Sequence, residues 1–339
     1  MLGRDTKRVA MTARERFQYL MNFEPVDRLP ILEWATWWDK TIARWRNEGL
    51  PAHLVDAGEI REYFGQDCYR QLWISPRKAT LPSAPAHGRG IVTSLAEYEG
   101  IKEHLYPEAI DVQRAREYAN RQAAGNMVVW VTLEGFFWYP RTLLGIENHL
   151  TAFYERPETV HAMNQDLLDF LVRMLDVLCA VCRPDFMTFA EDMSYHNGPM
   201  VSKALFDEFM APYYRQIVPK LHGYGIIPFI DTDGRTEDLV PWFAEVGIDG
   251  FLPMERQAGC DIVALRREYP RLRIIGGYDK MIMTNGEDAL RREFERILPV
   301  MRQGGYIPGV DHQTPPGVSL SEYRTYLKLL TEYCDKAAS

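Results

Sequence analysis

The stretch IIPFIDTDGRTEDLVPWF, residues 226–243, has the pattern of a strand, a turn and a helix. Its first five residues are apolar or proline, as in a buried β-strand, and a run with helical periodicity follows Thr236. Between them, Asp231 and Asp233 stand one residue apart just before a glycine. Two carboxylates held close repel each other unless a cation or a shared proton lies between them. The stretch therefore predicts a strand–helix unit that carries a polar site where the strand ends.

The same alternation continues on both sides of this stretch. Six strand-like runs lie at residues 127–133, 185–190, 226–230, 248–253, 273–277 and 306–310. Amphipathic helices separate them, as in residues 157–181, and we expect helix N-caps at Ser202, Thr236 and Ser319. Strand, helix and strand at these lengths predict right-handed parallel crossovers.

Two further strands complete the expected count. RLPILEW (28–34) is the first, and either 71–75 or 90–95 supplies the second from the less regular segment 50–125. No linker long enough to separate domains is visible. We therefore expect an α/β protein, a single (β/α)8 TIM barrel over residues 1–339, with an embellished N-terminal quarter.

Carboxylates follow seven of the predicted strands within about three residues, and one of these strands also ends beside a histidine. They are Glu33, Glu134, Glu191 with Asp192, Asp231 with Asp233, Glu255, Asp279, and Asp311 with His312. In a parallel barrel such residues converge on the C-terminal face, where these folds hold their chemistry. Each carboxylate also has a structural interpretation, because Asp and Glu near a helix start cap it. The pattern predicts an enzyme and the place of its site.

Histidines and aromatic residues add candidates at the same face. His312 could act as a metal ligand, an acid or base, or a hydrogen-bond donor, and His196 is a second candidate behind Glu191. Trp37 and Trp38 follow the first strand, and Phe137 follows the strand at 127–133. Such apolar surface suits a flat ligand, a lid or a dimer contact.

The composition excludes some classes of binding partner. The 339 residues have a formal net charge of -8 and no Lys/Arg run longer than a pair, which argues against nucleic acid. No stretch approaches the roughly 18 apolar residues of a membrane span, so we expect a cytoplasmic protein with a small-molecule substrate. The five scattered cysteines do not form a disulfide pattern, and Cys179 with Cys182 lies in an apolar helical run that favours packing.

Four blocks resemble the uroporphyrinogen decarboxylase superfamily, which also contains corrinoid-linked methyltransferases. They are MTARERFQYLMNFEPVDRLPI (11–31), EDMSYHNGPMVSKALFDEFMAPYYRQI (191–217), IIGGYDKMIMTNGEDALRREFERIL (274–298) and GGYIPGVDHQTPPGVSLSEYRTYLKLL (304–330). They occur in the family's order and span about residues 11–332. The resemblance implies a (β/α)8 barrel.

Departures from the family pattern separate its branches. Decarboxylases carry an arginine-rich RQAGR loop that grips the substrate carboxylates, whereas the corresponding stretch here reads LEWATWWDKTIARW (32–45). The methyltransferases bind zinc through a His-x-Cys pair and a distant Cys. Those ligands are replaced here by Asp231, Asp233 and His312, which could still bind zinc with one position open.

The resemblance therefore implies a methyltransferase that moves a methyl group between a small substrate and a corrinoid, carried by a partner protein. We expect Glu191, Glu255 and His312 to be catalytic, and zinc at Asp231, Asp233 and His312. The substrate would contact Glu33, Trp37, Trp38, Glu134, Phe137, His196 and Asp279. An aromatic methyl ether, giving an O-demethylase, fits the aromatic residues, and a methylamine fits the acidic rim. Alternatives are a uroporphyrinogen decarboxylase-type lyase, for which His312 matches a family histidine, and a non-catalytic corrinoid- or tetrapyrrole-binding protein. The sequence is also compatible with a homodimer.

Overall fold

A computed structural model describes residues 10–338 and divides the chain into two compact units. The first unit contains Met1–Tyr69, Arg121–Val128 and Asp261–Ser339, and the second contains Arg70–Asn120 and Val129–Cys260. The single-domain organisation stays a prediction.

Five strands form the centre of the second unit. They are β1 (Tyr69–Ile74), β2 (Val128–Glu134), β3 (Phe186–Ala190), β6 (Ile227–Asp231) and β7 (Gly250–Leu252), in the sheet order β1-β2-β3-β6-β7. From β2 to β7 each neighbouring pair is parallel, and Glu134, Ala190, Asp231 and Leu252 lie in register at their carboxyl ends. The loops after these strands therefore start from one edge of the sheet.

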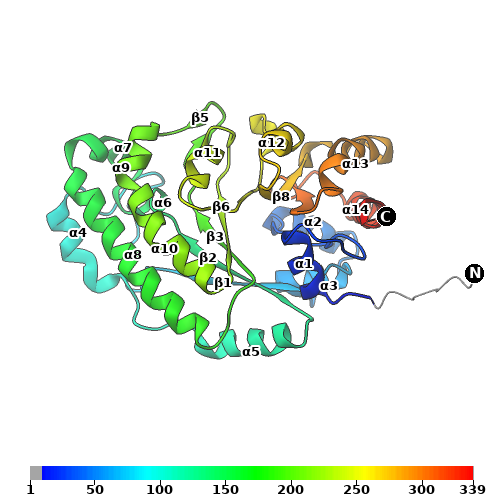
Figure 1. Cartoon of the computed structure of the whole chain (residues 1–339), viewed down its shortest axis with the longest axis horizontal. Helices are drawn as coiled ribbons and strands as arrows, with labels where there is room; N and C mark the ends of the chain where they lie inside the picture. The colour runs from blue at the N-terminus through cyan, green and yellow to red at the C-terminus, as the bar shows by residue number, and fades with distance from the viewer. Residues whose placement is uncertain (1–9, 339) are drawn as a thin grey trace, which may run out of the picture. The chain divides into compact units, whose positions relative to one another are not determined.

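Helices connect these strands, as the alternation in the sequence predicts. They are α4 (Leu95–Ile101), η1 (Lys102–His104), α5 (Val112–Ala123), α6 (Trp138–Leu144), α7 (Ile146–Glu155), α8 (Pro157–Cys179), α9 (Lys203–Phe209), α10 (Ala211–Gly223), α11 (Leu239–Ala244) and η2 (Arg256–Ala258), with a small hairpin of β4 (Ser194–Tyr195) and β5 (Gly198–Pro199). Helix α8 starts with proline at its first turn and buries apolar residues at spacings of three and four, among them Val160, Met163 and Leu167. Helices α8 and α10 lie side by side in Figure 1.

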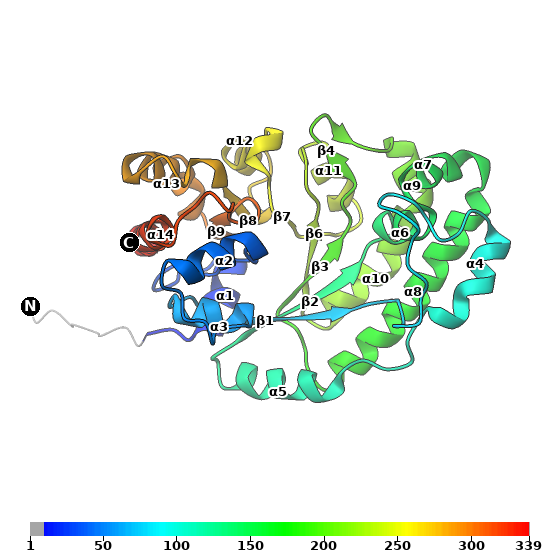
Figure 2. The ribbon, with the colours of Figure 1, turned by 180° about the vertical axis from the view of Figure 1, so that it is seen from behind.

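The first unit contains one pair of parallel strands. Strand β8 (Arg273–Tyr278) pairs with β9 (Tyr306–Val310), and Tyr278 is in register with Val310 at their carboxyl ends. Its helices are α1 (Ala13–Met21), α2 (Asp39–Asn47), α3 (Ala57–Tyr63), α12 (Ile262–Glu268), η3 (Lys280–Ile282), α13 (Glu287–Met301) and α14 (Leu320–Ala338). Figure 2 shows the ribbon from behind, with the helices and strands labelled.

Most of the predicted strands are confirmed, and one is wrong. All six runs after residue 126 form strands, and β1 confirms the strand at 71–75 over the one at 90–95. Residues 28–34 do not form a strand, so the described residues contain seven main strands instead of eight. The parallel α/β class is confirmed, while a closed eight-stranded barrel is not.

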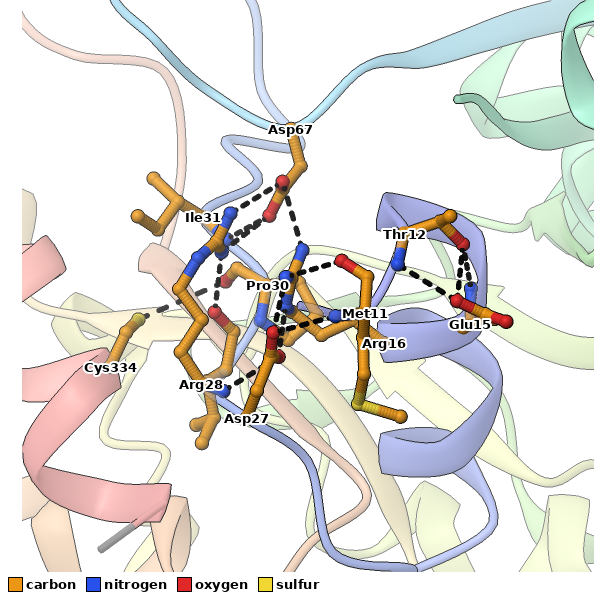
Figure 3. A network of polar contacts seen from close by, with 11 residues as sticks. Met11, Thr12, Glu15, Arg16, Asp27, Arg28, Pro30, Ile31, Asp67 and Cys334 are labelled. Carbon is orange, nitrogen blue, oxygen red and sulfur yellow. Dashed lines mark hydrogen bonds and ion pairs between the residues drawn. The ribbon is translucent and has the colours of Figure 1, made fainter. Parts of the chain in front are cut away.

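Residues 28–34 form no regular secondary structure and are bonded in another way, which explains the missing strand. The Ile31 amide instead donates to Asp67 Oδ2 at 2.9 Å, and the Arg28 guanidinium forms two hydrogen bonds of 2.7 Å with the same carboxylate. Figure 3 shows Asp67 between Ile31, Arg28 and Arg16. Long-range side-chain bonds thus replace strand pairing.

Local signals agree with the structure in most places. Ser202 and Ser319 accept the amides of Leu205 and Glu322 at helix starts, as predicted, whereas α11 begins at Leu239, so the N-cap predicted at Thr236 is wrong. The five cysteines form no disulfide, and Cys179 and Cys182 are buried. In the described part of the chain, no helix is both long and apolar enough to cross a membrane.

Candidate functional site

The loops after β3, β6 and β7 are tied together at one end of the second unit. The Asp233 amide donates to Asp192 Oδ1 at 3.3 Å, and the Gly234 amide donates to Glu255 Oε2 at 3.1 Å. Gly234 has a φ of 82°, and a Cβ there would lie 2.6 Å from the Cα of Tyr195. Only glycine lets these loops approach so closely.

Two non-glycine residues of this loop cluster have left-handed backbone conformations. They are Asp192, with a φ of 42°, and Met254, with a φ of 59°. Such conformations cost about 1–3 kcal/mol each and persist where surrounding bonds enforce them, which is common at functional sites. The strained residues therefore lie at the ends of β3 and β7, where the candidate carboxylates also lie.

A pocket of about 360 Å³ opens between these loops. It is lined by Ser194, Tyr195, His196, Asp233, Gly234, Glu255, Gln257 and Ala258. Three predicted site residues, His196, Asp233 and Glu255, thus come together, and no Lys or Arg is among the lining residues. Tyr195 is 47% exposed and offers an aromatic surface at the pocket. The pocket is acidic, partly aromatic and small.

Glu191 lies at the end of β3 but is completely buried. Its carboxylate accepts the amides of Phe136, Phe137 and Trp138 at 2.9, 2.9 and 3.0 Å and the hydroxyl of Tyr214. Burial raises the pKa of Glu191 to about 7, although these hydrogen bonds lower it. The contacts show a carboxylate that holds the loop after β2, and its predicted catalytic role gains no support from them.

Gly135 explains how the loop after β2 can fold over Glu191. A Cβ at Gly135 would lie 2.1 Å from the Glu191 carboxyl carbon, so a side chain there would expel the carboxylate. The position of the Glu191 carboxylate therefore requires glycine at residue 135.

Glu134, predicted to bind substrate, is held by an arginine. Both Arg77 terminal nitrogens bond its carboxylate, and the same guanidinium reaches the Thr142 hydroxyl. Burial lowers the pKa of Arg77, but its bonds to Glu134 outweigh that effect and raise it. Because Glu134 is 3% exposed and already paired, it has little capacity left for a ligand.

Phe137, also predicted to contact substrate, belongs to the core. Its side chain is fully buried, and its ring centroid lies 4.7 Å from that of His149 and 6.5 Å from that of Phe153. It offers no surface to an aromatic ligand. Its prediction as a substrate contact finds no geometric support.

His149 beside Phe137 is expected to make the protein sensitive to acid. It is fully buried with both ring nitrogens unpartnered, and burial, assisted by Arg141, lowers its pKa to about 3. The unfolded chain binds this proton below about pH 6.5, so His149 lowers stability progressively as pH falls from 6.5 towards 3. We expect a loss of about 2 kcal/mol between pH 7 and pH 5 that His149→Phe abolishes.

Urea unfolding at the two pH values measures this loss, with the exposed His53→Gln as the matched control. A loss of the same size in His149→Phe would contradict the assignment.

The first unit contains two buried acids, Glu33 in the segment 28–34 and Asp311 directly after β9. Glu33 is fully buried, accepts the Tyr326 hydroxyl at 3.0 Å and the Val310 amide at 3.1 Å, and burial raises its pKa to about 8 despite these bonds. Asp311, also buried, faces Lys280 Nζ at 3.5 Å. These acids are enclosed by the unit's own side chains.

The other predicted site residues of this unit, Asp279, Trp37 and Trp38, differ in their contacts and exposure. Asp279 accepts the Met281 amide at 2.8 Å and caps η3, as its structural interpretation predicts. Trp37 is 6% exposed and packs against Trp45 and Tyr323, whereas Trp38 is 46% exposed. Trp38 is the one of the two that presents an aromatic surface.

The predicted zinc ligands are divided between the units. Asp231 and Asp233 belong to the second unit and His312 to the first. Among residues 10–338, no group of three or more His, Cys, Asp or Glu side chains is arranged to hold a metal ion. Cys260 is buried, with its sulfur 3.4 Å from the Gly234 carbonyl oxygen. Zinc at Asp231, Asp233 and His312 stays a prediction.

The sequence did not reveal Tyr195 and Gln257 as pocket residues, nor Arg77 as the partner of Glu134. Tyr195 directly precedes His196, so a search of the whole loop after β3 would have found it. Arg77 and Glu134 lie 57 residues apart, and no local pattern predicts their pairing.

The family is shown by sequence comparison. The profile of the family described as Uroporphyrinogen decarboxylase (URO-D) matches residues 84–333, which is most of the chain. The chain therefore belongs to the uroporphyrinogen decarboxylase family. No curated protein sequence matches it significantly.

Solved structures resemble the chain only distantly. A putative vitamin-B12 independent methionine synthase from Listeria monocytogenes has a TM-score of 0.44 at 10% identity, covering 92% of this chain and 98% of its own. A 3-keto-D-glucoside 4-epimerase from E. coli has a TM-score of 0.40 at 14% identity, covering 77% and 99%. Similarity at this level does not indicate an activity.

Proposed function

We propose that the chain is a methyltransferase that moves a methyl group between a small methylated substrate and a corrinoid on a partner protein. The family contains decarboxylases and corrinoid-linked methyltransferases, so the choice between them rests on the site. The observation that carries the proposal is the pocket of the second unit, lined by Asp233 and Glu255 without Lys or Arg. Such a pocket repels anions and attracts cations.

The size and charge of the pocket disfavour uroporphyrinogen as the substrate. Ligand pockets span about 300–1,000 Å³, and this one, at about 360 Å³, is near the lower limit. A polycarboxylate porphyrinogen needs arginine or lysine partners, and its carboxylates would meet Asp233 and Glu255 here. A small substrate without negative charge suits the pocket better.

A methylated amine fits the pocket better than the aromatic methyl ether favoured by the aromatic content of the sequence. Phe137 is enclosed in the core, so it cannot hold an aryl group. Tyr195, in contrast, is half-exposed at an acidic pocket. A ring beside carboxylates is the arrangement that recognises methylated ammonium groups.

Each pocket residue has its own role in the proposed reaction. Asp233 and Glu255 hold the ammonium group, and the face of Tyr195 contacts its methyl groups. When the methyl group leaves, the C–N bond breaks with both electrons going to nitrogen, so the product is a neutral amine. The free amine then takes up a proton from water, because Glu255 and Asp233 are ionised when they hold the cation. The corrinoid supplies the carrier for the methyl group.

Two assays test the proposal against the decarboxylase alternative. We expect trimethylamine or tetramethylammonium to methylate cob(I)alamin in the presence of the protein, with the accompanying absorbance change. Uroporphyrinogen should release no carbon dioxide. Formation of coproporphyrinogen without any cobalamin methylation would overturn the proposal in favour of the lyase.

A further inference from the structure

The pocket of the second unit has more room than a simple methylated ammonium ion fills. Its volume is about 360 Å³. At about 30 Å³ for each water-sized group, such a volume holds roughly a dozen non-hydrogen atoms. Trimethylamine and tetramethylammonium have fewer than half as many. A substrate that fills the pocket therefore carries a further group beside its ammonium nitrogen.

His196 at this pocket has a side chain that no protein group engages. Within residues 10–338 its imidazole forms no hydrogen bond, ion pair or ring contact. A neutral imidazole offers one N–H donor and one nitrogen acceptor. The neighbouring Ser194 hydroxyl, in contrast, already donates to the Arg235 carbonyl oxygen. His196 can therefore meet a polar group of a ligand without giving up a bond within the protein.

The backbone around His196 is fixed to the loop that carries Asp233. His196 is the first of the two residues that join β4 to β5. The Arg235 amide donates to the Tyr195 carbonyl oxygen at 3.0 Å, and Gly234 has no Cβ to keep the two loops apart. His196 and Asp233 are therefore held at a set separation, which favours a ligand with two different ends because little ordering remains to be done on binding.

The charge of the pocket decides the nature of the second group. No Lys or Arg lines it, so a substrate carboxylate would face Asp233 and Glu255 without a counter-charge. A hydroxyl group carries no charge and can both donate to an imidazole and accept from it. At the end away from the ammonium group, the pocket therefore suits an alcohol better than an acid.

We propose that the substrate is a methylated amino alcohol of the choline type, with its hydroxyl group hydrogen-bonded to His196. The assignment rests on the proposed function, in which Asp233 and Glu255 hold the ammonium group, and it gives His196 the other end of the same ligand. In the reaction the C–N bond breaks with its electron pair left on nitrogen, and the methyl group passes to cob(I)alamin, which becomes methylcob(III)alamin. The other product is the neutral amino alcohol with one methyl group fewer.

Isothermal titration calorimetry of the full chain with choline and propyltrimethylammonium tests the role of the hydroxyl group. The two cations have nearly the same shape and the same charge, and a methyl group replaces the hydroxyl group in the second. We expect choline to bind about fivefold more tightly, the factor that a hydrogen bond of about 1 kcal/mol gives. His196→Ala should abolish the difference by weakening the binding of choline alone. Asn197→Ala is the matched control, because Asn197 is exposed, lies in the same turn and does not line the pocket.

Each other outcome has a separate meaning. Equal binding of the two cations to the unchanged protein would overturn the choline-type substrate and leave the acidic cation site standing. A preference for choline that persists in His196→Ala would overturn the role of His196. If neither cation binds, the proposed function fails and the assignment of the hydroxyl group fails with it.

Initial rates of cobalamin methylation give a second readout of His196. His196→Ala should raise KM for choline about fivefold and leave kcat unchanged, because the hydroxyl group is bound equally before and during methyl transfer. An unchanged KM would overturn the contact between His196 and the substrate.

Discussion

Replacing Glu191 by alanine is expected to lower the free energy of unfolding by about 4 kcal/mol. The change leaves the amides of Phe136, Phe137 and Trp138 and the hydroxyl of Tyr214 without their shared acceptor in a fully buried place. Each unsatisfied buried donor costs about 1–3 kcal/mol, partly relieved by water entering the cavity. Urea denaturation followed by circular dichroism measures the loss.

Two further variants make the Glu191 test specific. Glu208→Ala on α9, an exposed position without a hydrogen bond among the described residues, should change stability by less than about 0.5 kcal/mol. Tyr214→Phe removes one of the four donors and should cost about 1–2 kcal/mol. A loss below about 1 kcal/mol in Glu191→Ala would show that the carboxylate does not hold the loop after β2.

The double variant Asp233→Asn with Glu255→Gln should lower kcat/KM for a methylated amine by about 100-fold or more. Each carboxylate contributes a charge-assisted contact worth about 1.5–3 kcal/mol, and the amides keep nearly the same shape. Glu255→Gln retains a side-chain carbonyl oxygen that can accept the Gly234 amide, so the loop should keep its position. Most of the loss should appear in KM, because the carboxylates bind the cation in the ground state.

Initial rates of cobalamin methylation measure this effect. Asp207→Asn on α9 serves as the control, since Asp207 is exposed, pairs with Lys203 and does not line the pocket. Unchanged kinetics in the double variant would show that the pocket does not bind the substrate.

The strands after residue 126 could be predicted because each is a short apolar run between polar turns, a signal that lies within the strand itself. β9, for example, has the predicted bounds of 306–310. The segment 28–34 has the same apolar appearance, but the distant Asp67 decides its bonding. Structure that depends on a partner far along the chain is not visible in a local pattern.

The same distinction applies to the site. Asp233, Glu255 and His196 were predicted because each follows a strand, and the structure brings them to one pocket. Glu134 and Glu191 also lie at strand ends, yet other protein groups occupy their carboxylates. Arg77 binds Glu134, and Tyr214 donates to Glu191. A strand-end carboxylate therefore marks the correct edge of the sheet, while its partners decide whether it can meet a ligand.

The acidic pocket as a site for a methylated cation is the central claim, and isothermal titration calorimetry tests it most directly. The probes are choline and 3,3-dimethylbutan-1-ol, which have nearly the same shape and differ in the positive charge. We expect choline to bind at least about tenfold more tightly, and the difference to vanish when Asp233→Asn and Glu255→Gln are combined. Equal binding of the two probes, or a preference for choline that survives in the double variant, would contradict the account.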